Sequence, residues 1–475
     1  MDFVQQFVAA INDVLWSKLL IALLIGAGLY FTFRTKFVQF RLFKDMVRLL
    51  SESASGANEK EKGVSSFQAF CISTASRVGI GNLAGVAIAI SVGGPGAVFW
   101  MWAIALIGAA SAFVESTLAQ IYKVKDGDTF RGGPAYYMEK ALGQRWMGML
   151  FAVLITICFG LVFNSVQANT ITLAFKTAFG ADRLMVGFFV TLMFAFIVFG
   201  GVKRIARMSE YIVIVMALLY IAITIFVIAI HITEVPAMFA LIFKSAFGLE
   251  QAVGGSIGAA IMMGIKRGLF SNEAGMGSAP NAAATANVSH PVKQGLVQSF
   301  GVFVDTILIC SCTAFIVLLS GAYTNAKLEG IELTQVALST HIGAWAQSLI
   351  AIIILLFAFS SLVGNYYYGE TNIEFLNANK VWLYAYRVAV IGMILFGSVA
   401  KVQIVWDLAD LFMALMAIVN LIAILRLGKI AFAALRDYTN QKKVGKDPIF
   451  YADSIEGLEN IEAWEYSARE SEQVS

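Results

Sequence analysis

The chain has 475 residues, of which 59% are hydrophobic and 14% are charged, and its mean hydropathy is +0.76. Soluble domains are about 45–50% apolar and about 25% charged, so this composition excludes an ordinary soluble protein and predicts a membrane protein with several spans. The formal net charge of +3 is too small to indicate nucleic-acid binding.

Apolar runs long enough to cross a bilayer, about 20 residues each, follow one another along the chain. We count eleven: 7–33, 67–92, 97–122, 147–175, 184–201, 211–232, 249–265, 295–319, 344–368, 382–399 and 405–425. The first run has no small-residue cleavage site and leads into basic residues, which favours a retained span over a signal peptide. We therefore predict an all-α polytopic membrane protein, with a transporter domain over residues 1–430 and a cytoplasmic tail over 431–475.

Basic residues favour one orientation of these spans. If the first helix enters the cytoplasm, the cytoplasmic connections are rich in lysine and arginine and the outer connections are poor in them, as the positive-inside rule requires. This predicts an N-terminus outside and a C-terminus inside, which fits an odd number of spans. The basic residues assigned to the cytoplasmic side are Arg34, Lys36, Arg41, Lys44, Arg48, Lys123, Lys125, Lys203, Arg204, Arg207, Lys266, Arg267, Lys293 and those from Arg426 onward.

The second run contains the most informative segment, Ser76–Asn82, which places two glycines, an arginine and an asparagine inside an apolar stretch. Lipid offers no hydrogen-bond partners, so a broken backbone there must be buried in protein or line a polar cavity. Secondary transporters build substrate and ion sites at such breaks. Carbonyls before Gly79 could bind a cation, and the N–H groups of Ile80, Gly81 and Asn82 suit a carboxylate. A glycine kink used only for packing is the alternative.

The seventh run is also rich in glycine. With the first helix (7–33) set aside, ten spans divide into halves 66–232 and 249–427, and each half opens with an interrupted run, which is the sequence pointer to an inverted repeat. We place the second break at 254–258. The competing segment is Ser271–Ser278, which Lys266 and Arg267 would place at the cytoplasmic edge as a loop or gate. The preferred break supplies three candidate substrate residues: Gly254, Gly255 and Ser256.

Polar side chains occur in two further runs. Asn164 and Gln167 are three residues apart in the fourth run and share a helical face, so they could bind substrate or join helices. The neighbouring Phe163 would keep the substrate space small. Ser360 and Ser361 are adjacent in the ninth run, and in isolation they would bond to carbonyls of their own helix.

Three ionisable residues lie within spans: Arg77, Glu115 and Asp305. Charges at this depth are costly and are usually paired or functional. We predict that at least one of the two carboxylates neutralises Arg77, which would make them a buried charge network.

Four motifs together resemble one family of transporters. The segment Gly93–Trp102 resembles the signature of the alanine or glycine:cation symporters, the sodium:alanine symporter family. The segments Gly79–Gly85, Arg131–Tyr137 and Gly268–Pro280 resemble its other landmarks, in the same order. The resemblance extends to about Leu427.

This resemblance implies a LeuT-type fold of five-plus-five inverted repeats with one extra N-terminal helix, about eleven transmembrane helices in all. It implies symport of alanine, glycine or a similar small neutral amino acid with sodium as the co-transported ion, by alternating access across the plasma membrane, and no enzymatic activity. The substrate carboxylate would meet the amides of Ile80 and Gly81. By motif position, sodium would bind the carbonyls and hydroxyls of Ala75, Val78, Phe357, Ser360 and Ser361.

Other functions remain possible on the sequence alone. A proton-coupled carrier, or one that prefers glutamine or a D-amino acid, would have the same fold. A membrane enzyme or a channel is less well supported, because no catalytic set or filter repeat is evident. Apart from the lipid bilayer, we expect neither nucleic acid nor an obligate protein as a partner.

Overall fold

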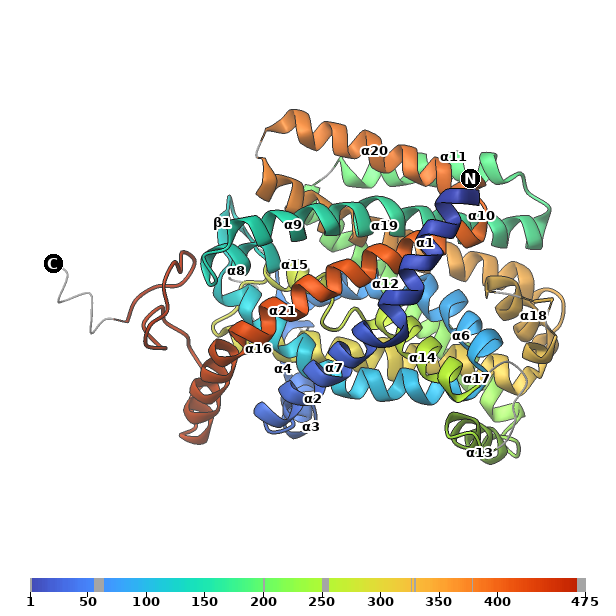
Figure 1. Ribbon diagram of the computed structural model, residues 1–475, viewed down its shortest axis with the longest axis horizontal. Coiled ribbons are helices and arrows are strands. Elements are labelled where there is room, and N and C mark those ends of the chain that lie inside the picture. The colour runs from blue at the N-terminus through green and yellow to red at the C-terminus, as the bar shows by residue number, and fades with distance from the viewer. Residues whose placement is uncertain are drawn as a thin grey trace.

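The computed structural model describes residues 2–54, 64–199, 201–249, 256–325, 327–328, 330–377 and 379–467. Long helices lie side by side and run along the longest axis of the molecule (Figure 1). The N-terminal part comprises α1 (Asp2–Val14), the π-helical η1 (Leu15–Leu19), α2 (Leu20–Arg34), α3 (Val38–Arg41), α4 (Phe43–Ala54), α5 (Ser66–Arg77), the π-helical η2 (Gly81–Gly85), α6 (Val86–Gly93) and α7 (Gly96–Ile121).

A short hairpin interrupts the otherwise helical fold and leads to the middle part of the chain. Its strands, β1 (Val124–Asp126) and β2 (Thr129–Arg131), pair in antiparallel register, with Lys125 opposite Phe130. The following elements are α8 (Pro134–Lys140), α9 (Arg145–Ile155), the π-helical η3 (Thr156–Phe163), α10 (Asn164–Phe179), α11 (Arg183–Val198), α12 (Gly201–Ile230) and α13 (Val235–Ala246). The apolar runs of the sequence did not predict α13 as a separate helix.

The C-terminal part begins at residue 256. It comprises α14 (Ile257–Asn272), α15 (Ala279–Ala283), α16 (Pro291–Val302), the π-helical η4 (Phe303–Cys310), α17 (Ser311–Ser320), the 3₁₀ turn η5 (Ala322–Thr324), α18 (Gly330–Ile342), α19 (Ala346–Leu376), α20 (Lys380–Val399) and α21 (Val402–Lys443). The last helix extends beyond residue 430, where we expected the membrane domain to end.

Among the described residues, seven helices are long and apolar enough to cross a membrane. An eighth is added if α5 and the η2–α6 segment, which meet at an angle of 49°, form one broken span. A membrane protein with several spans is therefore confirmed. The count of eleven, the inverted repeat, the two halves and the orientation of the termini stay predictions.

The first and last helices contact each other, although they are far apart in the sequence. In Figure 1 the blue α1–α2 pair crosses the face of the bundle and overlies the orange α21. The side-chain amide of Asn12 donates to the Asp407 carbonyl at 2.9 Å, and the Trp16 indole donates to the Asp410 carbonyl at 3.2 Å. These bonds fix the N-terminal helix against α21.

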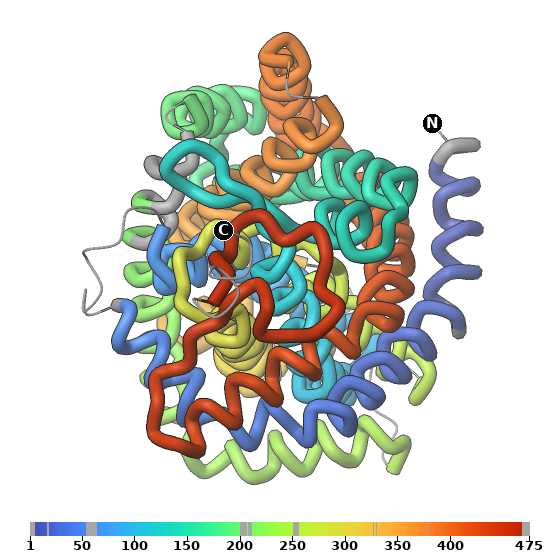
Figure 2. The backbone as a smooth tube through the Cα atoms, turned by 90° about the vertical axis from the view of Figure 1, so that its left-hand side faces the viewer, coloured from blue at the N-terminus to red at the C-terminus, as the bar shows by residue number. Residues whose placement is uncertain are grey.

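The segment after Lys443 folds back over one end of the bundle (Figure 2). Phe450 N–H donates to the Ser289 carbonyl at 2.8 Å, just before α16, and the Trp464 indole donates to the Gln120 carbonyl at 3.0 Å, at the end of α7. The Lys123 ammonium lies 4.0 Å from the centre of the Phe130 ring and 4.9 Å from that of Trp464. Residues in the interval 444–467 are thus bonded to α7 and to the residue before α16, within the part of the chain that we predicted as a tail.

Candidate functional site

The predicted break in the second apolar run is confirmed. A capping box at Ser65 and Gln68 begins α5, and α5 ends at Arg77. The backbone then leaves helical geometry at Val78, where ψ is 84°, and resumes as a π-helical segment at Gly81. Segments of π-helix inside α-helices are frequent at functional sites. The whole break is buried.

Two glycines let neighbouring helices approach this break. A Cβ atom on Gly79 would lie 2.1 Å from the Ser361 hydroxyl oxygen of α19. A Cβ atom on Gly81 would lie 2.8 Å from the Phe270 ring of α14. The glycines therefore serve close contact as well as the bend.

The structure brings the predicted sodium ligands of α5 and α19 together. The Ser361 hydroxyl lies 2.9 Å from the Ala75 carbonyl and 3.1 Å from the Ser76 carbonyl. The Ser360 hydroxyl lies 2.8 Å from the Phe357 carbonyl and 3.4 Å from the Ala75 carbonyl. Carbonyls of an unwound helix together with hydroxyl oxygens are suited to Na⁺. Val78, the remaining predicted ligand, is the C-cap of α5.

Of the predicted substrate residues, Gln167 reaches the amide side of the break and Asn164 does not. Ile80 N–H donates to Gln167 Oε1 at 3.4 Å, and Gly79 N–H donates to Asn82 Oδ1 at 2.9 Å. The Asn164 side chain instead donates to the Gly160 carbonyl of its own helix at 3.0 Å. Gln167 is therefore the better candidate of the two.

Phe163 begins an aromatic row beside the break. Its ring stacks on Phe270 with centroids 4.6 Å apart, and Phe270 contacts Trp406 of α21 at 4.9 Å. Because Phe270 also fills the space beside Gly81, this row covers the break on one side. Phe163 thus lies in the aromatic row beside the break, and its part in limiting the substrate space stays a prediction.

Among the described residues, the interruption lies at 273–278 and not at 256–258, the described part of the position that we preferred. Ser256 is exposed and caps the start of α14, with its hydroxyl accepting from Ala259 N–H at 3.3 Å. The helix then runs without interruption to Asn272 and ends at Glu273, whose φ is +58°. The backbone stays irregular and buried until α15 begins. Gly254 and Gly255 lie outside the described residues.

Lys266 and Arg267 favoured our placement of Ser271–Ser278 at the cytoplasmic edge. Arg267 forms a two-pronged ion pair with Asp410 of α21, at 3.0 and 2.9 Å, and Lys266 contacts the same carboxylate at 2.7 Å. The Arg267 guanidinium also lies 4.6 Å from the centre of the Trp406 ring. Both cations are therefore paired with a carboxylate of α21 inside the helix bundle.

Among the described residues, Arg77 makes no direct ion pair with Glu115 or Asp305, and its neutralisation by one of them stays a prediction. Arg77 donates to the backbone carbonyl of Gln298 at 3.2 Å and to its side-chain oxygen at 3.1 Å. Within the described part of the chain, its guanidinium forms no ion pair. The carboxylate of Asp305 accepts from the Asn82 amide at 2.7 Å.

Glu115 has a different role from the one we predicted. It accepts hydrogen bonds from Gly275 N–H and Gly277 N–H, both at 3.1 Å, and from the Asn420 side chain at 2.8 Å. Backbone N–H groups that lie inside protein need such partners. Glu115 therefore holds the second break in its irregular conformation.

Glu273 is the functional candidate that the sequence analysis did not single out. It accepts from the Ser76 hydroxyl at 2.8 Å, across the two breaks, and from the Ser278 hydroxyl at 2.5 Å. Ser76 also lies 2.7 Å from the Asn365 side-chain oxygen of α19. The sequence does show an acidic residue inside the Ser271–Ser278 motif. It was not considered as a site residue because that motif was assigned to the cytoplasmic edge.

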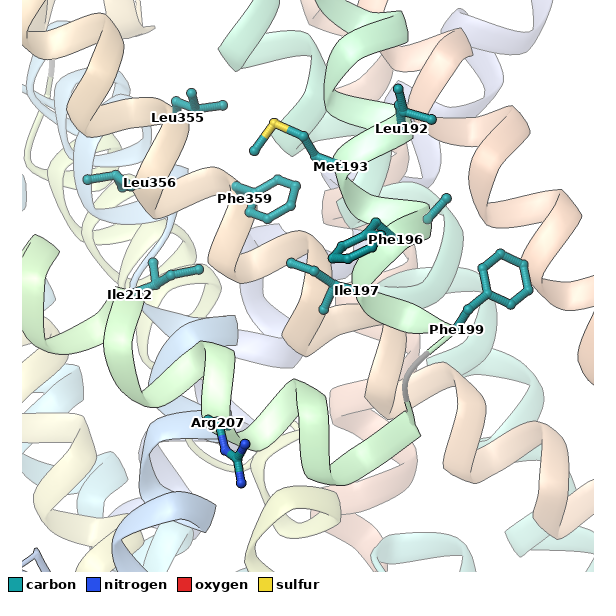
Figure 3. Close-up of a pocket in the computed structure, with 11 residues that line it drawn as sticks. Leu192, Met193, Phe196, Ile197, Phe199, Arg207, Ile212, Leu355, Leu356 and Phe359 are labelled. Carbon is teal, nitrogen blue, oxygen red and sulfur yellow. The ribbon is translucent and has the colours of Figure 1, made fainter.

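A separate crevice of about 1320 Å³ lies between α11, α12 and α19 (Figure 3). Apolar side chains line it, and among the described residues the charged side chain in its lining is that of Arg207. Leu192 and Phe196, both on its α11 side, are among the exposed side chains. A zwitterion needs several fixed polar partners, so this crevice is not the substrate site.

Comparison with known proteins agrees with this architecture. The family model described as "Sodium:alanine symporter family" matches residues 1–452. The chain is 62% identical to the probable sodium/glutamine symporter GlnT of Bacillus subtilis (strain 168), over 98% of this chain and 97% of that protein. It is 56% identical to the amino-acid carrier protein AlsT of the same organism, over 99% and 100%.

A solved structure shows a similar fold. The chain is similar to MhsT, solved in complex with L-phenylalanine, with a TM-score of 0.56 and 15% sequence identity, over 79% of this chain and 96% of that one. At this identity the likeness concerns the fold alone. Taken together with the family match over almost the whole length, these findings show that the chain belongs to the sodium:alanine symporter family.

Proposed function

We propose that this chain is a secondary active symporter that imports a neutral amino acid together with sodium by alternating access. The supporting observation is the break that follows α5. Hydroxyls of α19 meet α5 carbonyls on one side of Gly79, and backbone N–H groups lie on the other side, beside Gln167. One interrupted helix thus offers a cation site and a carboxylate site within a few residues.

Sodium would bind the oxygens of Ala75, Val78, Phe357, Ser360 and Ser361. Since these residues come from α5 and α19, the ion would hold the two helices together and fix the break in the conformation that binds the amino acid. Such coupling is reciprocal, so the amino acid would raise the affinity for sodium equally. Moving one charge through 100 mV supplies about 2.3 kcal/mol for uptake.

The amino acid would place its carboxylate at Ile80 and Gly81, beside Asn82 and Gln167. Alanine and glycine fit the family description, whereas the printed name of GlnT makes glutamine the competing substrate. A proton in place of sodium is the alternative coupling ion. We further propose a location in the plasma membrane with the N-terminus outside, the C-terminus inside and about eleven spans in five-plus-five halves.

Uptake into proteoliposomes tests this function. Labelled alanine and glutamine are supplied with an inward sodium gradient, with an equal proton gradient, or with neither. We expect accumulation only with sodium. Accumulation driven by protons alone would replace sodium as the coupling ion, and uncoupled flux would indicate a channel.

The Ser361→Ala variant tests the cation site. Loss of one oxygen that contacts a charge is worth about 1.5–3 kcal/mol, so the sodium concentration for half-maximal uptake should rise about tenfold or more. Ser339→Ala is the matched control, because among the described residues the Ser339 hydroxyl bonds to the Gln335 carbonyl of its own helix. Equal sodium dependence of the two variants would contradict the assignment.

A further inference from the structure

A polar cluster of Ser76, Glu273 and Asn365 lies where the two breaks meet α19. Ser76 precedes the first break, Glu273 begins the second, and Asn365 is one helical turn beyond Ser361. All three are buried, with 5%, 1% and 0% of their surface exposed. The Ser76 hydroxyl lies 2.8 Å from a Glu273 oxygen and 2.7 Å from an Asn365 oxygen.

The hydrogen-bonding groups of this cluster cannot all be paired with one another. The Ser76 hydroxyl has one proton but faces two acceptors, so it can donate to only one of them. If it donates to Glu273, the Asn365 amide must turn its NH₂ group toward Ser76, which leaves the amide oxygen open. In the orientation observed, Asn365 Nδ2 has no partner. Either orientation leaves one polar atom of a buried amide unpaired, which is costly.

The Glu273 carboxylate also has unused capacity. Two hydroxyls donate to it, one to each oxygen, whereas an ionised carboxylate can accept about four hydrogen bonds. Among the described residues it forms no ion pair. The cluster therefore contains a Glu273 carboxylate that can accept further hydrogen bonds, close to an Asn365 amide group that has an unpaired atom.

An aromatic wall connects this cluster with the amide side of the first break. Phe270 fills the space beside Gly81 and stacks on Phe163 at 4.6 Å. Phe163 contacts Phe159 at 4.6 Å, and Phe159 contacts Tyr368 of α19 at 5.4 Å. The Tyr368 side chain is buried. The aromatic wall thus begins beside the first break, where we propose that the substrate carboxylate binds. It ends at α19, one turn beyond the polar cluster.

We propose that Ser76, Glu273 and Asn365 bind the terminal carboxamide of the substrate side chain, so that the protein carries glutamine in preference to alanine. This inference rests on the proposed symport and specifies its substrate. A carboxamide NH₂ donates to Glu273, and its carbonyl accepts from Asn365 Nδ2. Its methylene groups lie along the aromatic wall. The methyl group of alanine reaches neither polar partner.

The same cluster discriminates against glutamate, which has the shape of glutamine. Its side-chain carboxylate would face the carboxylate of Glu273 inside the protein, where like charges repel strongly. It also lacks the N–H donors that Glu273 would accept. Sites that hydrogen-bond a substrate group reject analogues lacking it more strongly than apolar pockets reject a change in size.

The test compares sodium-driven uptake of glutamine, alanine and glutamate in proteoliposomes. For the native chain, kcat/KM for glutamine should exceed that for alanine by about tenfold or more, and glutamate should not compete. Asn365→Leu keeps the side-chain size and should lower the glutamine value about tenfold while the alanine value changes less than about twofold. Glu273→Gln should allow glutamate to compete. Thr371→Val, which alters a buried unpaired hydroxyl on the same helix, is the control.

Equal use of alanine and glutamine by the native chain would overturn the subsite, as would a parallel loss of both in Asn365→Leu. Thermal stabilisation of the purified native protein by glutamine, but not by alanine, supports the proposal even where a variant fails to fold. Stabilisation of equal size by both amino acids would overturn it. Absence of sodium-driven uptake for every amino acid would instead overturn the proposed symport itself.

Discussion

Different interactions stabilise the irregular backbone at the two breaks in the bundle. At the first, glycines admit neighbouring side chains: Gly79 lies against the Ser361 hydroxyl and Gly81 against the Phe270 ring. At the second, the buried carboxylate of Glu115 accepts from the N–H groups of Gly275 and Gly277. The first break therefore depends on closeness to α19 and α14, and the second depends on hydrogen bonds to one acidic residue of α7.

This difference has a functional consequence. The backbone groups of the second break are already occupied by Glu115, so its free chemistry lies in the side chain of Glu273. At the first break the carbonyls before Gly79 and the N–H groups after it lie close to hydroxyl and amide side chains that an ion or substrate can replace. We therefore expect changes at the second break to affect folding most, and changes at the first to affect transport.

The largest effect should come from Glu115→Leu. This change leaves two backbone N–H groups and the Asn420 amide without their acceptor. A buried donor left without an acceptor costs about 1–3 kcal/mol, so the loss of three such bonds should lower the free energy of unfolding by about 3 kcal/mol or more. Thermal unfolding in detergent measures the loss, with Glu115→Gln as a milder variant that keeps one acceptor oxygen. A Tm within a degree of the native value would remove the contrast between the breaks.

An intermediate effect is expected for Gly79→Ala, and it should concern transport rather than folding. The added methyl group would lie 2.1 Å from the Ser361 hydroxyl, so the serine must leave the proposed cation site. Sodium-driven uptake should fall about tenfold or more, in line with loss of a contact to a charge. Gly392→Ala is the control, because a Cβ atom there meets nothing within 4 Å. Unimpaired uptake in Gly79→Ala would show that the close approach is not required.

The smallest effect concerns His290, on the connection that follows the second break. Burial lowers the pKa of His290 although Asp437 lies 3.1 Å away, and its Nδ1 accepts from Val292 N–H at the start of α16. The folded protein therefore keeps this ring neutral, and the unfolded chain takes up the proton as pH falls below about 6.5. Stability should decline over that range by less than about 1.4 kcal/mol per pH unit.

His290→Asn keeps a capping side chain and removes this titration. The comparison is the change in Tm between pH 7.5 and pH 5.5. The native protein should lose more than the variant. An equal loss in both would assign the pH dependence to other groups.

The first break was predictable because its signals are local. Two glycines, an arginine and an asparagine stand together in an apolar run, and a single helix must accommodate them. The serine pair of α19 could be connected to it only through the family resemblance. The contact itself joins Ser361 to Ala75, residues separated by 286 positions.

The second break was misplaced because its signals depend on distant partners. Lys266 and Arg267 resemble the basic edge of a span until Asp410 is known to face them, 143 residues beyond Arg267. The partner of Arg77 was also not predicted, because Gln298 is neutral and 221 residues away. A rule that assigns charges to the membrane surface cannot recognise charges that are paired within the bundle.

The segment that follows α21 constrains the end of the bundle that it covers. It is bonded to the end of α7 through Trp464 and to the start of α16 through Phe450, and Asp447 pairs with Lys293. It therefore links α7 and α16 to each other at that end of the bundle. They can separate there only as far as the chain between Phe450 and Trp464 can stretch, unless one of the two attachments is released.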